Sequence, residues 1–142
     1  MQYKKFDNVI VARIDKGEEI VDSVKKIAVS ENIKTASINA LGATNNFTVG
    51  VLNTSEKKYY SNTFKGDFEI VSLTGTITSM NNDVYTHIHM SAGNDKGEVF
   101  GGHLNKAYVS ATCEMIITVI NGEVGRRFDD DTGLNLFDFS RK

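Results

Sequence analysis

One segment near the start of the chain, residues 18–31, carries its apolar residues at helical spacing. These residues are Ile20, Val21, Val24, Ile27 and Ala28. Glu18 and Glu19 lie at the beginning of the segment and Lys25 and Lys26 in its later part, the arrangement that the helix dipole favours. The pattern predicts one long helix over 18–31.

The pattern changes outside this segment to short runs of β-branched and aromatic residues, separated by Gly, Asn, Asp and Ser. The predicted strands are Asn8–Ile14, Thr35–Ala43, Phe47–Leu52, Lys57–Phe64, Phe68–Ser79, Val84–Ala92, Glu98–Leu104, Tyr108–Ile120 and Leu134–Phe139. Within residues 35–120, the connections between them are much shorter than the dozen or more residues that a parallel crossover needs. We therefore expect an α+β domain, in which an antiparallel β-sheet packs against one main helix.

The composition fits a single domain over residues 1–142. Hydrophobic residues make up 40% and charged residues 24% of the chain, as in ordinary globular domains. The formal net charge is −2 and the pI is near 5.9, whereas domains that bind nucleic-acid phosphates commonly have a pI above about 9. The single cysteine fits a reducing compartment, and no apolar run approaches the roughly 20 residues of a membrane span. We expect a soluble cytoplasmic protein whose partners are neither DNA nor membranes.

The candidate chemistry lies in the three histidines, which all fall within seventeen residues. His87 and His89 are two residues apart in a predicted strand, so their side chains share one face. A hairpin centred on Asp95 would place His103 opposite His87 and Gly101 opposite His89. Opposed side chains have Cβ atoms about 4.5–5.5 Å apart, close enough for the imidazoles to share a metal ion.

Three histidines with an open fourth position are a ligand set of catalytic zinc, although imidazole also binds copper, nickel, cobalt and iron. Glu69, Glu98, Asn105 and Glu114 are candidates to complete the coordination shell or to act as a general base. We consider Glu69 and Glu114 the first carboxylates to test for a catalytic role. A cupin-like interpretation of the His-x-His pair is not favoured, because the Glu expected a few residues after the second His is absent.

Three other groups of residues have structural interpretations. Cys113 lies in an apolar strand and is expected to fill the core. Asp129–Asp131 lack the alternate spacing of a calcium loop and predict an exposed acidic turn before Gly133. The basic and aromatic stretch 57–60 predicts a solvated strand end rather than a single-strand nucleic-acid site.

Several motifs in order along the chain resemble the plant- and prokaryote-conserved (PPC) domain. They are RIDKGEE at 13–19, ALGA at 40–43, FEIVSLTGT at 68–76, HIH at 87–89 and GGHL at 101–104. The resemblance implies an α+β domain around an antiparallel sheet that assembles into a homotrimer. It also implies that prokaryotic members can carry a metal, commonly zinc, on histidines that match His87, His89 and His103.

Three functions follow as hypotheses. The first is a homotrimeric protein that binds a divalent metal, with a small molecule or anion at the open position. If it is an enzyme, the accessible chemistry is Lewis-acid polarisation or attack by metal-bound hydroxide. The second is a non-enzymatic interaction module with a structural metal. The third, a DNA-binding regulator, is disfavoured because the plant proteins use a proline-containing AT-hook and this sequence has no proline.

Overall fold

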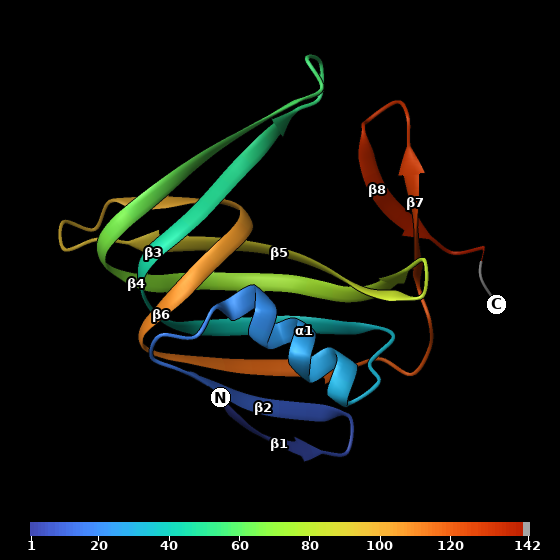
Figure 1. The fold of residues 1–142 in the computed structure, drawn as a ribbon, viewed down its shortest axis with the longest axis horizontal. Helices are drawn as coiled ribbons and strands as arrows, with labels where there is room; N and C mark the ends of the chain where they lie inside the picture. Colours follow the sequence, from blue (N-terminus) through green and yellow to red (C-terminus); the bar gives the residue numbers. More distant parts are fainter. Residues whose placement is uncertain (141–142) are drawn as a thin grey trace.

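The computed structural model describes residues 1–140, which form a strongly bent sheet of eight strands with one helix beside it (Figure 1). The elements are β1 (Gln2–Phe6), β2 (Val9–Asp15), α1 (Ile20–Ser30), β3 (Ala36–Asn53), β4 (Lys58–Met80), β5 (Asp83–Gly93), β6 (Val99–Val119), β7 (Gly125–Asp129) and β8 (Leu134–Asp138). The strands run in the order β1-β2-β6-β3-β4-β7-β8, and β5 pairs with both β4 and β6. Because β3 also pairs with both of those strands, β3 to β6 close into a ring.

The predicted class is confirmed at the level of a mostly β structure with one helix. In the part of the chain that the structure describes, all the strand pairs are antiparallel except for a single parallel contact between β4 and β7, at Ser79 and Gly125. Within residues 1–140, no helix is long and apolar enough to cross a membrane.

The prediction was wrong about the lengths of three strands. The runs expected as separate strands at 35–43 and 47–52 form one strand, β3, and the same is true of the paired runs that form β4 and β6. Each of these strands continues through β-bulges, which bend a strand without ending it. The prediction also missed β1 and β7.

Gly42 lies at one of these bends, where the register shifts between β3 and both of its neighbours. A Cβ atom at this position would overlap the backbone carbonyl oxygen of Thr112 on β6. Glycine therefore permits the close approach of two backbones at the bend.

Helix α1 forms where the helical pattern predicted it. Its N-cap residue, Glu19, accepts a hydrogen bond from the backbone N–H of Asp22 at 2.8 Å. The helix buries Ile20, Val24, Ile27 and Ala28 in the main core. Ile88, Met90 and Ala92 of β5 also lie in the core. Because side chains alternate along a strand, His87, His89 and Ser91 project from the opposite face of β5.

Candidate metal centre

The three histidines come together on the face of the sheet formed by β5 and β6. One ring nitrogen from each of His87, His89 and His103 lies within 4.8 Å of the other two. The Nε2 atoms of His87 and His89 are 3.1 Å apart, and the ring centroids are 4.9 to 5.6 Å apart. In a tetrahedral site with metal–nitrogen bonds of about 2.0–2.1 Å, the nitrogens lie about 3.3 Å from one another. The predicted convergence is confirmed, and the spacing fits a single metal ion.

The predicted register of this hairpin was wrong by two residues. His103 lies opposite His89 rather than His87, and Gly101 lies opposite Ser91. The cause is the position of the turn, which occupies residues 94–98 and leaves Gly93 in β5. Because a shift of two residues keeps every side chain on its face, all three rings still meet.

Asn94 determines where this turn lies. Its side-chain oxygen accepts hydrogen bonds from the backbone N–H groups of Lys96 and Glu98, each at 3.0 Å. Its backbone carbonyl accepts a third bond, from Gly97, whose φ of +76° lies in the left-handed region that favours glycine. These bonds close a five-residue loop whose flanking residues, Gly93 and Val99, are paired.

The surroundings of His87 and His103 favour the neutral form of both side chains. Burial, the neighbouring imidazoles of His89 and His103, and Arg126 lower the pKa of His87 to about 4. Burial and His89 also lower the pKa of His103. At neutral pH these two rings therefore have lone pairs free for a metal ion, which binds the unprotonated form.

The structure does not bring the carboxylates that the sequence nominated into the histidine cluster. Glu69 pairs with Gly93, four residues along β5 from His89, which corresponds to about 13 Å. Glu98 accepts a hydrogen bond from the side chain of Asn94 within the turn. Glu114 lies opposite Arg13 and lines a groove on β1, β2, β3 and β6. A catalytic role for Glu69 or Glu114 stays a prediction that these positions do not support.

The remaining candidate, Asn105, is linked to the histidines through Tyr59, which the sequence analysis assigned to a solvated strand end and not to the site. The Tyr59 hydroxyl donates to Asn105 Oδ1 at 2.8 Å and lies 3.5 Å from the backbone oxygen of His103. Its ring is edge-on to the imidazole of His103, with centroids 6.1 Å apart. The side chain of Tyr59 passes over Gly50 of β3. A Cβ atom at Gly50 would lie 2.5 Å from the Tyr59 hydroxyl, so a side chain there would block this path. No local pattern in the sequence indicates this contact, because it depends on the pairing of three strands.

The sequence analysis also missed Arg126, which lies on β7 beside the cluster. Its guanidinium is held by the hydroxyls of Thr76 and Thr78 on β4 and by the backbone oxygen of Asn135 on β8. Thr76 is the cross-strand partner of His87, so the guanidinium of Arg126 lies at the edge of the histidine cluster.

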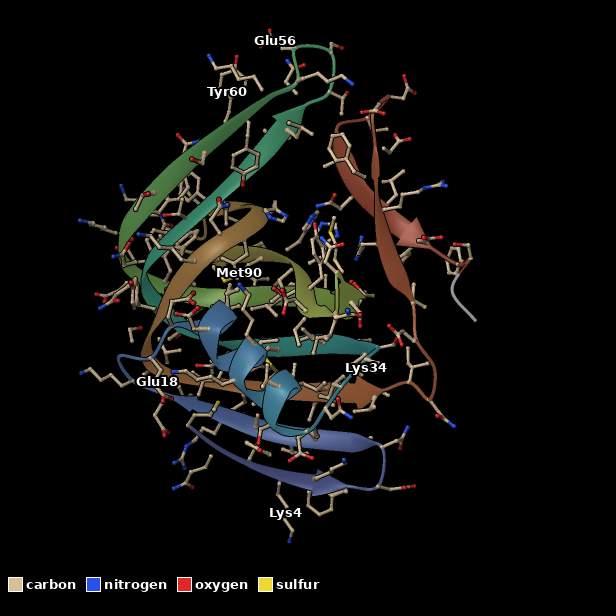
Figure 2. All side chains as sticks on the ribbon, turned by 45° about the vertical axis from the view of Figure 1, so that its right-hand side comes forward. Lys4, Glu18, Lys34, Glu56, Tyr60 and Met90 are labelled. Carbon is tan, nitrogen blue, oxygen red and sulfur yellow. The ribbon has the colours of Figure 1, made fainter. Side chains whose placement is uncertain are left out.

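The expectations for Cys113, for the acidic turn at 129–131 and for the strand end at 57–60 agree with the structure. Cys113 is buried in the core. The carboxylate of Asp129 accepts hydrogen bonds from the backbone N–H and the hydroxyl of Thr132, in an acidic turn that ends at Gly133. Tyr60 donates to Glu56 at the exposed tip of the β3–β4 hairpin, where Figure 2 shows both side chains.

Comparison with known proteins gives one family match and three informative structures. The family is the Plants and Prokaryotes Conserved (PCC) domain, whose sequence pattern matches residues 1–121 of this chain. A crystal structure of a candidate DNA-binding protein from Bacteroides thetaiotaomicron is 34% identical with a TM-score of 0.96, over 99% of this chain and 98% of that chain. A metal-containing protein from Archaeoglobus fulgidus is 31% identical with a TM-score of 0.87, over 96% and 98%. A PPC protein from Pyrococcus horikoshii is 28% identical with a TM-score of 0.84, over 96% and 93%. Among curated proteins, no sequence matches this chain.

Proposed function

The chain belongs to the Plants and Prokaryotes Conserved domain family, and from this premise we propose that it binds a divalent metal, zinc, through His87, His89 and His103. The observation that carries the proposal is the convergence of three imidazole nitrogens, one from each histidine, within 4.8 Å of one another. The relative from Archaeoglobus fulgidus, which is 31% identical, is described as metal-containing, and this supports the proposal. A set of three histidines also leaves a position of the metal open for water or another ligand.

The chain's own residues supply the frame of this site. His87 and His89 bind from one strand and His103 from the next, and the Tyr59 ring lies edge-on to the His103 imidazole. When bound, such a metal acts as a Lewis acid or lowers the pKa of a coordinated water. We assign no reaction, and a non-enzymatic interaction module around the same metal is the alternative function.

We further propose that the protein is a cytoplasmic homotrimer. Support for association comes from the apolar residues Val11, Leu41 and Ile116, which are exposed along a groove of about 590 Å³ on the outer face of the sheet. Exposed apolar surface of this kind is typical of an interface. The low net charge gives no support to DNA binding, although the relative from Bacteroides thetaiotaomicron carries such a label.

Elemental analysis of protein prepared without a histidine tag tests the metal proposal. We expect about one zinc ion per chain in the wild type and loss of the metal in the His87→Ala/His89→Ala double variant, because one remaining imidazole binds zinc weakly. Ser91→Ala is the matched control, since Ser91 lies on the same face of β5 and is not proposed as a ligand. A wild-type protein that takes up no metal, or a double variant that retains it, would contradict the proposal.

A further inference from the structure

Arg126 is a buried cation for which the described part of the chain supplies no acidic partner. Its exposed fraction is 8%, and none of the ion pairs among residues 1–140 includes it. Its three hydrogen-bond acceptors, Thr76 Oγ1, Thr78 Oγ1 and the backbone oxygen of Asn135, are all uncharged. A buried charge is costly unless it is paired, so an unpaired guanidinium requires an explanation.

The aromatic neighbours of Arg126 fix the plane of the guanidinium without neutralising it. The guanidinium carbon lies 4.3 Å from the ring centroid of Phe137 on β8 and 4.9 Å from that of Tyr85 on β5. These cation–π contacts offset part of the cost of burial. The hydrogen bonds use three of the five N–H donors of the side chain, which leaves two donors for a further partner.

Strand register places this charge next to the metal centre. Nη2 of Arg126 is 3.2 Å from the hydroxyl of Thr76, which lies opposite His87, and Tyr85 lies two residues before His87 on the same face of β5. The influence of Arg126 on the pKa of His87 agrees with this proximity. A divalent metal held by the three imidazoles would therefore lie beside a second positive charge, and no Asp or Glu belongs to the cluster that the structure describes.

We propose that Arg126 binds a small oxyanion, a carboxylate or a phosphate, that occupies the open position of the metal. This inference rests on the proposed metal-binding function. A planar guanidinium with two free donors matches the oxygens of such an anion, and the anion balances the charges of the metal and of Arg126.

The surroundings leave room for the rest of such a molecule. A hollow of about 280 Å³ lies beside His89, on the side away from Thr76. Ser72, Thr74 and Ser91 are among the residues that line it, and Gly101 and Gly102 add no side chains. The hollow has no charged side chain, so the charge of the ligand is recognised at Arg126 and the metal.

A purely structural role is the alternative, because Arg126 also joins β7 and β8 to β4. The two roles predict opposite effects on the metal. If Arg126 only clamps the hairpin, its replacement weakens the site and the metal affinity falls. If it binds an anion, Arg126→Gln removes a repelling charge, so metal affinity is kept or rises while anion affinity falls.

Cobalt(II)-loaded protein provides the test, with the visible spectrum of the metal as the readout and acetate and inorganic phosphate as separate probes. We expect a saturable spectral change with at least one probe in the wild type. In Arg126→Gln the dissociation constant of that probe should rise about tenfold or more, with the cobalt affinity unchanged or higher. Arg127→Gln is the matched control, because it removes the same charge from the next, exposed position of β7.

Saturation by acetate or by phosphate in the wild type supports the proposal and identifies the class of anion. A metal-loaded wild type that responds to neither probe overturns the proposal and leaves the metal-binding function intact. An unchanged dissociation constant in Arg126→Gln also overturns it, and a wild type that binds no metal contradicts the proposed function itself. If Arg126→Gln does not fold, the test is an NMR titration of the zinc-loaded wild type with the anion, which follows the guanidinium ¹⁵N resonances of Arg126. A saturable shift of these resonances with the anion supports the proposal, and no shift overturns it.

Discussion

Cys113 lies in the core part of β6 and is fully buried. Burial and the neighbouring carboxylate of Glu114 raise the pKa of its thiol to about 12. Since the thiolate is the reactive form, and a pKa of about 12 leaves almost none of it at pH 8, we expect no reaction of the folded protein with Ellman's reagent. Protein unfolded in guanidinium chloride is the control and should release one equivalent per chain. Rapid stoichiometric labelling of the native protein would contradict this prediction.

The three histidines could be found from the sequence because two of them follow the alternation of a strand and the third follows one hairpin later. Arg126 and Tyr59 could not be found in this way. Arg126 reaches the cluster through a single parallel contact between β7 and β4, and Tyr59 reaches it by crossing β3 at Gly50. Both contacts join residues far apart in the chain, and no periodic pattern encodes which strands become neighbours.

The loop between β5 and β6 determines which residues of the two strands face each other. We expect Asn94→Ala to lower the free energy of unfolding by about 1–2 kcal/mol, because the backbone N–H groups of Lys96 and Glu98 lose their shared acceptor. We also expect weaker zinc binding, because the same loop sets His89 opposite His103. Urea denaturation and a zinc competition titration measure the two effects.

Asp95→Ala is the control for this loop, since Asp95 occupies the next position and its side chain is exposed. Its stability and zinc affinity should match those of the wild type. An Asn94→Ala variant that keeps both properties would show that strand pairing alone fixes the register.

Elements that end at a cap or a polar turn were easier to identify than elements that bend or that lie at an edge of the sheet. Helix α1 and β5 agree with their predicted ranges to within two residues, because caps and polar turns mark where they stop. The bends inside β3, β4 and β6 contain Gly and Asn, which the sequence analysis interpreted as turns. β1 and β7 were missed because their sequences, QYKKF and GRRFD, are mostly polar and charged. Each of them lies against a neighbouring strand of the sheet, which a local pattern does not reveal.

The molecule as a whole has two differently built surfaces. One surface carries the histidine cluster on β5 and β6. The β3–β4 and β7–β8 hairpins both project toward the top of the view in Figure 1. Lys57, at the tip of the first hairpin, donates to the backbone oxygens of Asp130 and Asp131 in the second. The other surface is the outer face of β2, β3 and β6, where apolar side chains border the groove. The proposed chemistry and the proposed self-association therefore belong to different surfaces of one domain.

This separation makes the trimer independently testable. Light scattering after size exclusion should give about 47 kDa, three times the 15.7 kDa of one chain. Leu41→Asp combined with Ile116→Asp should give monomers, because two charges would then have to be buried in the interface. Val29→Asp is the control, since Val29 is 69% exposed on α1 and does not line the groove.

A wild type that elutes as a monomer contradicts the trimer, and a double variant that stays trimeric places the interface on another surface. Because the groove and the histidines do not share residues, a double variant that dissociates but keeps its zinc would show that one chain holds the complete metal site.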